Sequence, residues 1–509
     1  MKSNFALVTI LFIFLSPTLF AQHQFCGMSS EDCNMVKAEM LKNRKEMKDF
    51  VFPRNAVTYV PIRFFLVGDS DGSGRGTETS CLTALCNLNR AYEELEIQFY
   101  LKEFKKINNG NIYDNPLSSP GSNAISNQME YNAINIFLVK DAPDPQDPNS
   151  NSSIAAFYQP PSSGPDKADW IVCTQQYISD IRVLAHEIGH FFTLPHTFHG
   201  WETNAWNLPD HQNPVIQFWA PDGGTRVELA NGSNCGNAGD DFCDTAADYL
   251  FPSGNCSYND GVMDKNGDLL TPPIDNYMNY HFGCAEYLFT EEQVAAIKNS
   301  LFSSVRNYIR PNYTPETAKI TDVPVLVSPA HNEVLPYNEY VYLHWDPVAG
   351  ADSYYLDVFS GGFIFKGIVE SNTVLFKDEL ATNKPYWWKV FPFNEIDGCS
   401  QFSGTFKFKT GDGLNSLDEI EEVTSYEIMP NPVQSGTAIR LNVVADNNFA
   451  ATISLISMTG QILTTIERYE FKTGNASLEI STDNIPAGVY FVNIQSESGI
   501  LNKKVIVSY

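Results

Sequence analysis

The stretch from Ala185 to Glu202, AHEIGHFFTLPHTFHGWE, constrains the fold more than any other part of the chain. On a helix, His186 and His190 lie one turn apart on the same face, where two ring nitrogens can bind a single ion. Glu187 lies beside them, close enough to act on a water molecule at that ion. Another face carries apolar residues at helical spacing, namely Ile181, Leu184, Ile188 and Phe191. The pattern therefore predicts a core-packed helix that presents a metal site.

Residues 1–21 are predicted to be a secretory signal peptide. They contain one early lysine, an apolar run from Phe5 to Leu15, a helix breaker at Pro17 and a small residue at Ala21. This run is shorter than the ~20 residues that a bilayer span needs, and no later run is long enough, so we expect no transmembrane span. The 10 cysteines of an exported chain fit an oxidising compartment.

The chain is strongly acidic. It has 60 Asp and Glu residues against 33 Lys and Arg residues, which gives a net charge of −27. Such a surface repels phosphate backbones and anionic lipids, so we expect no nucleic acid partner. The 509 residues suggest about three folded units at ~150 residues each.

Residues 22–55 are polar and charged, and they are predicted to be a short pro-segment or a disordered lead-in. Cys26 precedes a glycine within this segment. Its thiolate could bind the metal and block the site until the segment is removed, as a cysteine switch. A local disulfide between Cys26 and Cys33 is an equally open alternative.

Strand and helix patterns alternate ahead of the histidine motif, which predicts an α/β sandwich with the histidine helix beneath a sheet. The first strand, YVPIRFFLV, follows Val57, and a helix is expected from Thr77 to Leu95. The further strands are expected at Ile97 to Phe104, at Ala133 to Val139, and in SIAAFYQP and DWIVC.

Several motifs carry a family resemblance. HEIGHFFTLPH resembles the extended zinc motif HExxHxxGxxH of the metzincin peptidases, and DNYMNY at Asp275 to Tyr280 resembles their methionine turn. Together with HTFHG, GDDFCDTAAD and CAEYLFTEEQ, these motifs resemble the pappalysin family in particular, from about Tyr59 to Ile309. The resemblance implies a metzincin-type α/β catalytic domain at residues 56–312 with the activity of a zinc endopeptidase.

The resemblance also implies a role for each matching residue. Glu187 would be the general base that takes a proton from a zinc-activated water. Met278 would lie beneath the metal, and Tyr280 would help to stabilise the transition state. The implied zinc ligands are His186, His190 and His196.

One position departs from the family pattern, because Thr193 stands where the family has a glycine. A β-branched residue with positive φ is disfavoured by about 1–2 kcal/mol, so we expect a strained or differently built turn. Pro195 biases Leu194 away from helical angles, and we expect His196 to turn back toward the metal. His199 is an alternative third ligand, or a histidine beside the site.

A calcium site is implied by GDDFCDTAAD. Asp240, Thr245 and a main-chain carbonyl near Cys243 match positions that bind calcium in the family, and calcium prefers oxygen ligands. DKNGD, from Asp264 to Asp268, resembles a calcium loop but lacks the following glutamate, so we expect a simple turn.

The resemblance implies a disulfide between Cys256 and Cys284 around the methionine turn, which leaves Cys235 to pair with Cys243. No partners are predicted for four further cysteines, which are Cys81, Cys86, Cys173 and Cys399.

Thr290 to Ile309 is expected to be the closing helix, with a capping box formed by Thr290 and Gln293. A proline-rich linker follows at residues 313–324. Residues 325–413 alternate apolar and polar positions in YVYLHWDPV and PYWWKVFPF and resemble a fibronectin type III module. This module could serve adhesion, substrate capture or spacing.

Residues 425–509 have short strands separated by PNP, MTG, PAG and SESG turns. They resemble the C-terminal sorting domain of type IX secretion substrates, and the alternative is a second ordinary β-sandwich. The expected fold is therefore multidomain, with an α/β metzincin-type catalytic domain followed by two all-β sandwich domains. We expect a secreted or cell-surface protein whose partners include the type IX secretion machinery.

Two functional hypotheses remain. The first is a secreted endopeptidase that uses zinc, with calcium as a second ion. It binds protein or peptide substrates as an extended strand against the sheet edge near Ser153 to Gln159. The second is a surface adhesin that retains a zinc-bearing but inactive fold. The presence of Glu187, Met278 and Tyr280 favours the first hypothesis.

Overall fold

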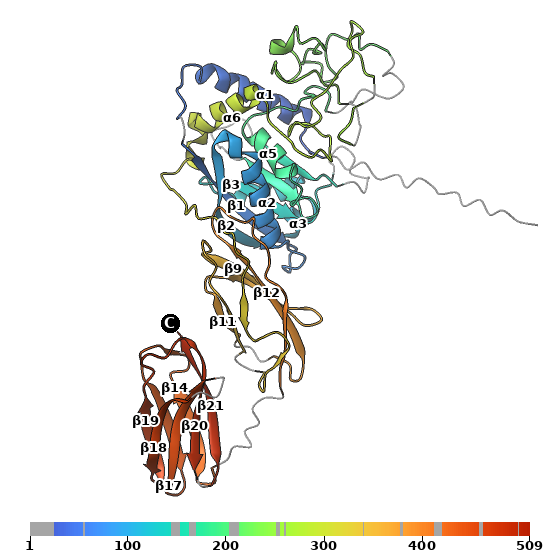
Figure 1. Ribbon diagram of the computed structural model, residues 1–509. Helices are drawn as coiled ribbons and strands as arrows, with labels where there is room; N and C mark the ends of the chain where they lie inside the picture. Colours follow the sequence, from blue (N-terminus) through green and yellow to red (C-terminus); the bar gives the residue numbers. More distant parts are fainter. Residues whose placement is uncertain are drawn as a thin grey trace, which may run out of the picture. The chain divides into compact units, whose positions relative to one another are not determined.

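The computed structural model describes residues 25–53, 56–143, 153–161, 169–202, 213–250, 255–258, 261–338, 341–376, 380–411, 420–457, 462–496 and 498–508. The expected signal peptide lies outside these residues. Figure 1 labels the helices and strands of the chain, which divides into two compact units. Unit 1 comprises Met1–Val323, Val348–Tyr355 and Phe391–Phe402, and unit 2 comprises Pro324–Pro347, Leu356–Val390 and Ser403–Tyr509.

Unit 1 is built on a five-stranded sheet with the order β2-β1-β3-β5-β4. The first four strands in this order pair in parallel, and β4 pairs antiparallel with β5 at one edge. Parallel strands are typically buried on both faces, which explains their near-continuous apolar runs. The strands are β1 (Thr58–Gly68), β2 (Ile97–Asn108), β3 (Ile134–Val139), β4 (Ala156–Gln159) and β5 (Trp170–Thr174).

Helices pack on both faces of this sheet, because successive strand residues point to opposite sides. Phe64 and Leu66 of β1 join a core that includes residues of α2 and α5, whereas Phe65 and Val67 join a core that includes residues of α3 and α4. The histidine helix is thereby held against one face of the sheet. The helices are α2 (Glu78–Ala91), α3 (Gly110–Asp114), α4 (Ser119–Gln128) and α5 (Val183–Phe191).

The histidine helix starts later than expected. Because α5 begins at Val183, Ile181 precedes it and is 41% exposed, so its expected place on the buried stripe is wrong. A turn in which Asp180 accepts a hydrogen bond from the Arg182 N–H, at 2.9 Å, comes immediately before the helix. The other stripe residues are buried, as expected.

Residues 30–46 form an ordered helix, so of the two alternatives for residues 22–55 the disordered lead-in is wrong, and the pro-segment stays a prediction. α1 (Ser30–Glu46) begins at the N-cap Ser29, whose hydroxyl accepts a hydrogen bond from the Asp32 N–H at 3.1 Å. Its buried residues recur at intervals of three and four and join the same core as α5. These residues are Cys33, Val36 and Met40.

Two of the expected helices end early. The helix expected from Thr77 is α2 followed by the 3-10 turn η1 (Glu93–Leu95). The closing helix α6 (Glu291–Phe302) has the predicted capping box of Thr290 and Gln293, which is confirmed. It ends because Ser303 has extended backbone angles, with φ −61° and ψ 158°, and the 3-10 helix η3 (Ser304–Ile309) follows.

The described residues between 192 and 290 lie mainly in turns and loops, with a 3-10 helix η2 (Cys235–Asn237). Several apolar residues of this segment, including Phe198, Trp201 and Tyr249, form a small core of their own, whereas Leu194, Phe242 and Met278 join the core around α5. The structure contains both disulfides expected here, Cys235–Cys243 and Cys256–Cys284. It also contains Cys86–Cys399, which joins α2 to the part of unit 1 at Phe391–Phe402.

The strands between Leu326 and Lys409 form two sheets, with the orders β10-β9-β12-β13-β7 and β11-β8-β6. The predicted alternation is confirmed in β8 and β12, and the buried Trp345 and Trp388 pack with their ring centroids 6.2 Å apart. The strands are β6 (Leu326–Ser328), β7 (Glu333–Val334), β8 (Val341–Trp345), β9 (Ser353–Phe359), β10 (Phe363–Val369), β11 (Thr373–Phe376), β12 (Pro385–Phe393) and β13 (Phe406–Lys409).

The C-terminal segment also forms two sheets, β14-β16-β19 and β15-β21-β20-β17-β18, over one apolar core. Its strands are β14 (Val423–Met429), β15 (Val433–Gln434), β16 (Ile439–Ala445), β17 (Phe449–Ser457), β18 (Ile462–Phe471), β19 (Gly474–Ile480), β20 (Gly488–Ser496) and β21 (Ile500–Ser508). The molecule is thus a mostly β, multidomain protein of β-sandwich character. No helix in the described part of the chain is long and apolar enough to cross a membrane.

Candidate metal centre

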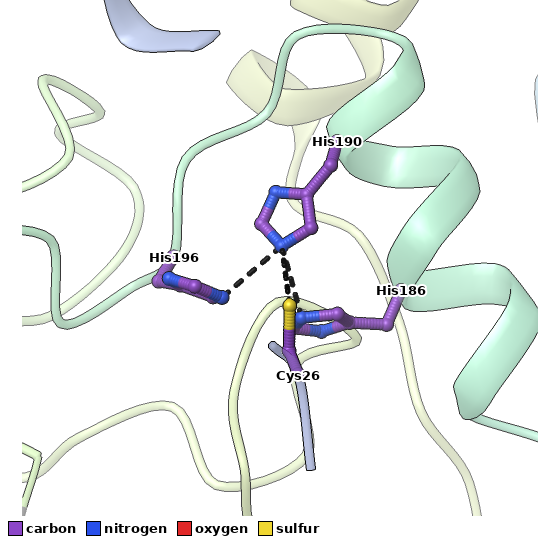
Figure 2. A group of neighbouring side chains, drawn as sticks. All are labelled: Cys26, His186, His190 and His196. Carbon is purple, nitrogen blue, oxygen red and sulfur yellow. Dashed lines mark hydrogen bonds between the residues drawn. The ribbon is translucent and has the colours of Figure 1, made fainter. Parts of the chain in front are cut away.

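Three histidines converge in unit 1. The Nε2 atom of His190 lies 3.0 Å from Nε2 of His186 and 3.1 Å from Nε2 of His196, and all three rings are buried (Figure 2). Ligands about 2.0–2.1 Å from a tetrahedral zinc ion are separated by roughly 3.3 Å. The spacing of the three nitrogens therefore fits one metal ion.

Main-chain carbonyls orient the two helical imidazoles. Nδ1 of His186 lies 2.7 Å from the carbonyl oxygen of Tyr277, and Nδ1 of His190 lies 2.8 Å from that of Leu194. A carbonyl only accepts hydrogen bonds, so each Nδ1 carries the proton and each Nε2 presents a lone pair. Burial lowers the pKa of all three imidazoles, which keeps them neutral as metal ligands must be.

A carboxylate faces the third imidazole. Oε1 of Glu202 lies 3.2 Å from Nδ1 of His196 and 3.3 Å from Nδ1 of His199. Burial raises the pKa of Glu202, but the hydrogen bonds from both imidazoles outweigh it and hold this pKa well below its usual range. His199 thus lies beside Glu202, outside the cluster of the three Nε2 atoms, and it is not the third ligand of that cluster.

The turn after α5 is built with positive φ at Thr193, at 71°, a backbone conformation that favours glycine. The N–H groups of Thr193 and Leu194 donate to the carbonyls of His190 and Gly189, at 2.8 and 2.9 Å, so the helix closes normally. A Cβ on Gly189 would lie 2.4 Å from the Sδ atom of Met278, so this close contact requires glycine.

Met278 and Tyr280 lie at the same site. The sulfur of Met278 lies against α5 at Gly189, and its N–H donates to Oδ1 of Asn276 at 2.8 Å. The hydroxyl of Tyr280 lies 3.3 Å from Nε2 of His196. Burial raises the pKa of Tyr280, so its hydroxyl keeps a proton to donate.

Glu187 is fully buried beside the histidines. Its Oε2 accepts from Sγ of Cys26 at 3.8 Å, and its Oε1 has no hydrogen-bond partner among the described residues. Burial raises the pKa of Glu187 to about 8. A nearby cation would favour the ionised form, so this carboxyl group is suited to exchange a proton near neutral pH.

The segment before α1 reaches this centre. Sγ of Cys26 lies 3.7 Å from Nε2 of His190, as Figure 2 shows. The N–H of Gly27 donates a hydrogen bond to the carbonyl oxygen of Ala156 at 3.0 Å. The N–H of Ala156 donates one to the carbonyl oxygen of Phe25 at 3.4 Å. Residues 25–27 therefore pair with β4, the edge strand on which substrate binding was expected.

Cys26 and Cys33 are both free thiols, so the alternative of a local disulfide between them is wrong for this structure. The ligand atoms of Cys26 and the three histidines lie within 4.8 Å of one another. Sγ of Cys33 lies 3.7 Å from Nδ1 of His196, on the other side of that ring. Burial raises the pKa of both thiols in the metal-free protein.

The expected calcium ligands lie close together. The fully buried Asp240 accepts from the Thr245 hydroxyl at 2.9 Å and from the Phe242 N–H at 3.0 Å, and the Thr245 hydroxyl also lies 3.1 Å from the Phe242 carbonyl. These oxygen atoms are of the kind that calcium binds. Cys243 enters a disulfide, and its N–H donates to Glu292 at 2.9 Å. At Asp264 the structure has a turn, as expected.

The sequence reasoning missed the roles of Glu202 and Cys33. Neither residue belongs to a motif with a fixed spacing from the histidines. One signal was available for Glu202, since metal-bound histidines commonly donate their second ring N–H to a carboxylate. No comparable signal existed for Cys33.

Comparisons with known proteins identify one segment and suggest a class for another. Residues 427–508 match the secretion system C-terminal sorting domain. This segment is therefore a type IX sorting domain, as predicted, and the chain is a secreted or cell-surface protein. An extracellular metalloprotease of Neurospora crassa is 24% identical over 285 residues, covering 53% of this chain and 84% of that protein. This weak similarity points to a protease.

Solved structures give low similarity. Fibronectin(III)-like modules of Clostridium thermocellum CbhA cover 36% of this chain and 92% of their own, with 10% identity and a TM-score of 0.15. PorZ, a surface component of the type-IX secretion system of Porphyromonas gingivalis, covers 24% of this chain and 15% of its own, with 16% identity and a TM-score of 0.13.

Proposed function

We propose that the chain is a secreted zinc-dependent endopeptidase of the pappalysin-like metzincin type, with its α/β catalytic domain at residues 56–312. The proposed zinc ligands are His186, His190 and His196. The observation that carries the proposal is the convergence of their three buried, neutral Nε2 atoms at 3.0 and 3.1 Å. The match to an extracellular metalloprotease supports the same class.

The residues around the histidines have matching chemical roles. A bound zinc ion supplies a Lewis acid and lowers the pKa of coordinated water. Glu187 takes the proton of the attacking water and later returns it to the leaving amine. Tyr280 donates a hydrogen bond from its hydroxyl to the carbonyl oxygen on which negative charge develops. Met278 packs against α5 at Gly189 and forms the apolar floor of the site.

The edge strand β4 supplies the binding surface for an extended peptide. Its main chain at Ala156 pairs with the segment from Phe25 to Gly27, which supports the binding of an extended strand at this edge. A protein substrate would replace this segment and place its scissile carbonyl near Glu187. In the latent chain, the Cys26 thiol would be the fourth zinc ligand and act as the cysteine switch.

Further parts of the proposal concern ions and export. Calcium would bind near Asp240, Thr245 and the main chain at Cys243, and would stabilise the loops around these residues. The fibronectin-like domain would be a spacer or an adhesive module. The type IX machinery would export the chain by means of its sorting domain.

Casein cleavage by the mature protein tests the proposal. Glu187→Gln should lower kcat by at least about 100-fold, because the general base is lost while the zinc ligands stay. The control is Glu94→Gln at an exposed residue of η1, which should keep full activity. Activity that survives Glu187→Gln, or an inactive wild type that binds zinc, would favour the inactive adhesin instead.

A further inference from the structure

The third histidine is held differently from the other two. His186 and His190 belong to α5 and direct Nδ1 to main-chain carbonyls. His196 lies beyond the helix, and its Nδ1 faces the carboxylate of Glu202 at 3.2 Å. A side chain six residues further along therefore fixes the orientation of this ring.

Glu202 is itself held in place. Its side chain is 5% exposed, and Oε2 accepts from the N–H of Gly200 at 2.8 Å. Gly200 has φ +95°, and a Cβ there would lie 2.8 Å from Cβ of Ala220 and 2.9 Å from Cβ of Thr225. The turn that brings this N–H to Glu202 therefore requires glycine. Oε1 of Glu202, the oxygen that faces His196, also lies 3.3 Å from Nδ1 of His199.

A fixed carboxylate at Nδ1 has a defined effect on an imidazole ligand. It keeps the proton on Nδ1, so the Nε2 lone pair faces the metal, and it makes the ligand more basic. The stacking of Phe198 on His196, with ring centroids 4.6 Å apart, leaves the ring plane fixed but does not select the nitrogen that carries the proton. Glu202 makes this selection.

We propose that Glu202 is a positioning residue that orients His196 as the third zinc ligand. The inference rests on the proposed function, because it requires a zinc ion at the three Nε2 atoms. It adds a residue outside the histidine motif to the site. Cys33 also lies against Nδ1 of His196, at 3.7 Å, so the carboxylate and a pro-segment thiol meet at one edge of this ring.

Zinc affinity tests the inference. The full chain is prepared with Cys26→Ala in every arm, so that the thiol does not mask the imidazoles, and zinc is titrated against a competing chelator. Glu202→Ala should weaken zinc binding by about 10- to 100-fold. Glu202→Gln keeps the shape and one acceptor oxygen, so its loss should be smaller. The matched control, Glu94→Ala, should bind zinc like the parent chain.

Cobalt substitution separates positioning from a merely structural role. In Glu202→Ala the visible d–d bands of bound Co²⁺ should shift, because His196 no longer binds with the same geometry, whereas Glu94→Ala should keep the parent spectrum. Parent affinity and parent spectrum in both Glu202 variants would overturn the inference. If Glu202→Ala does not fold, the isosteric Glu202→Gln decides by the same two measurements.

The outcomes also distinguish this inference from the proposed function. If the parent chain binds zinc and His186→Ala does not, the zinc site stands, and the Glu202 variants alone decide the role of Glu202. If His186→Ala binds zinc as well as the parent, the proposed function fails at its metal site. A second zinc ion per chain that is lost with Cys33→Ala would assign Glu202 to a second metal and also overturn the positioning role.

Discussion

The Gly27 N–H donates a hydrogen bond of 3.0 Å to the carbonyl oxygen of Ala156 on β4. This bond fixes the neighbouring Cys26, so that its Sγ lies 3.7 Å from Nε2 of His190. One main-chain contact thus pairs with the sheet edge and places a thiol at the candidate metal centre. Under the proposed function, latency and substrate binding would compete for the same surface.

Removal of this thiol should shorten latency. Cys26→Ala takes away the fourth ligand while leaving the main-chain pairing with β4, so we expect the precursor to mature earlier than the wild type. Cys81→Ala, at a free buried thiol of α2, is the matched control and should mature normally. The measurement is the time course of precursor cleavage after purification with zinc. An unchanged time course in Cys26→Ala would contradict the cysteine switch.

Metal removal should lower the stability of unit 1. A ligand at 100 times its Kd stabilises the folded state by about 2.7 kcal/mol, so chelation should lower the unfolding temperature and added zinc should restore it. His190→Ala should abolish this response, whereas His331→Ala at an exposed histidine should keep it. Thermal unfolding with a zinc titration measures the effect. A zinc response of normal size in His190→Ala would be inconsistent with the site.

The parts of the site that sequence reasoning predicted are local. Helical spacing places His186 and His190 on one face of a helix without any contact from distant residues. The alternation of apolar residues in β8 and β12 follows in the same way from the two-residue period of a strand. The position of His196 was expected from the family resemblance. The positive φ of Thr193, at 71°, agrees with the expected strain in the turn that leads to this histidine.

Apart from Glu202, which lies six residues after His196, the parts that were missed depend on contacts between distant residues. Cys33 meets His196 across 163 positions, and Cys86 pairs with Cys399 across 313 positions. No local pattern encodes such pairs. The helix α1 has a polar, charged sequence, and it is ordered because Cys33, Val36 and Met40 are buried against the core, a tertiary effect that overrides composition.

A buried ion pair should be important for the structure around α5. Arg306 pairs with Asp169, and it also donates to the carbonyl of Phe191, the last residue of α5, at 2.6 Å. Removal of one partner from a buried pair costs about 3–5 kcal/mol, so Arg306→Met should destabilise this region by that amount. Lys42→Met breaks an exposed pair and should cost at most about 1 kcal/mol.

Hydrogen exchange at α5 and β5 in the full chain measures how far each substitution lowers the free energy of opening in this region. Exchange should become faster throughout α5 in Arg306→Met, and it should stay unchanged in Lys42→Met. Equal protection of α5 in both variants would show that the buried pair contributes no more than the exposed one.

The buried carboxyl groups around Asp240 predict a pH dependence of stability. Burial, followed by the charges of Asp240, Asp248 and Asp241, raises the pKa of Glu228 from 4.5 to about 9. Burial raises the pKa of Asp240 from 3.8 to about 8. At a pH between the ordinary pKa values of these two groups and their raised values, the folded protein therefore binds more protons at them than the unfolded chain does. Its stability should fall as the pH rises through this window.

Calcium should reverse this loss if it binds among these oxygen atoms, because a cation favours the ionised carboxylates. Burial lowers the pKa of the histidines at the metal centre, so these are neutral in both states above about pH 7. We therefore expect the unfolding temperature of the metal-free protein to fall between about pH 7 and pH 8, and calcium to restore most of the loss at the higher pH. Glu228→Gln should flatten the dependence, and Glu94→Gln should not. A stability that rises over this range in the metal-free wild type would contradict the raised pKa values and the proposed calcium site.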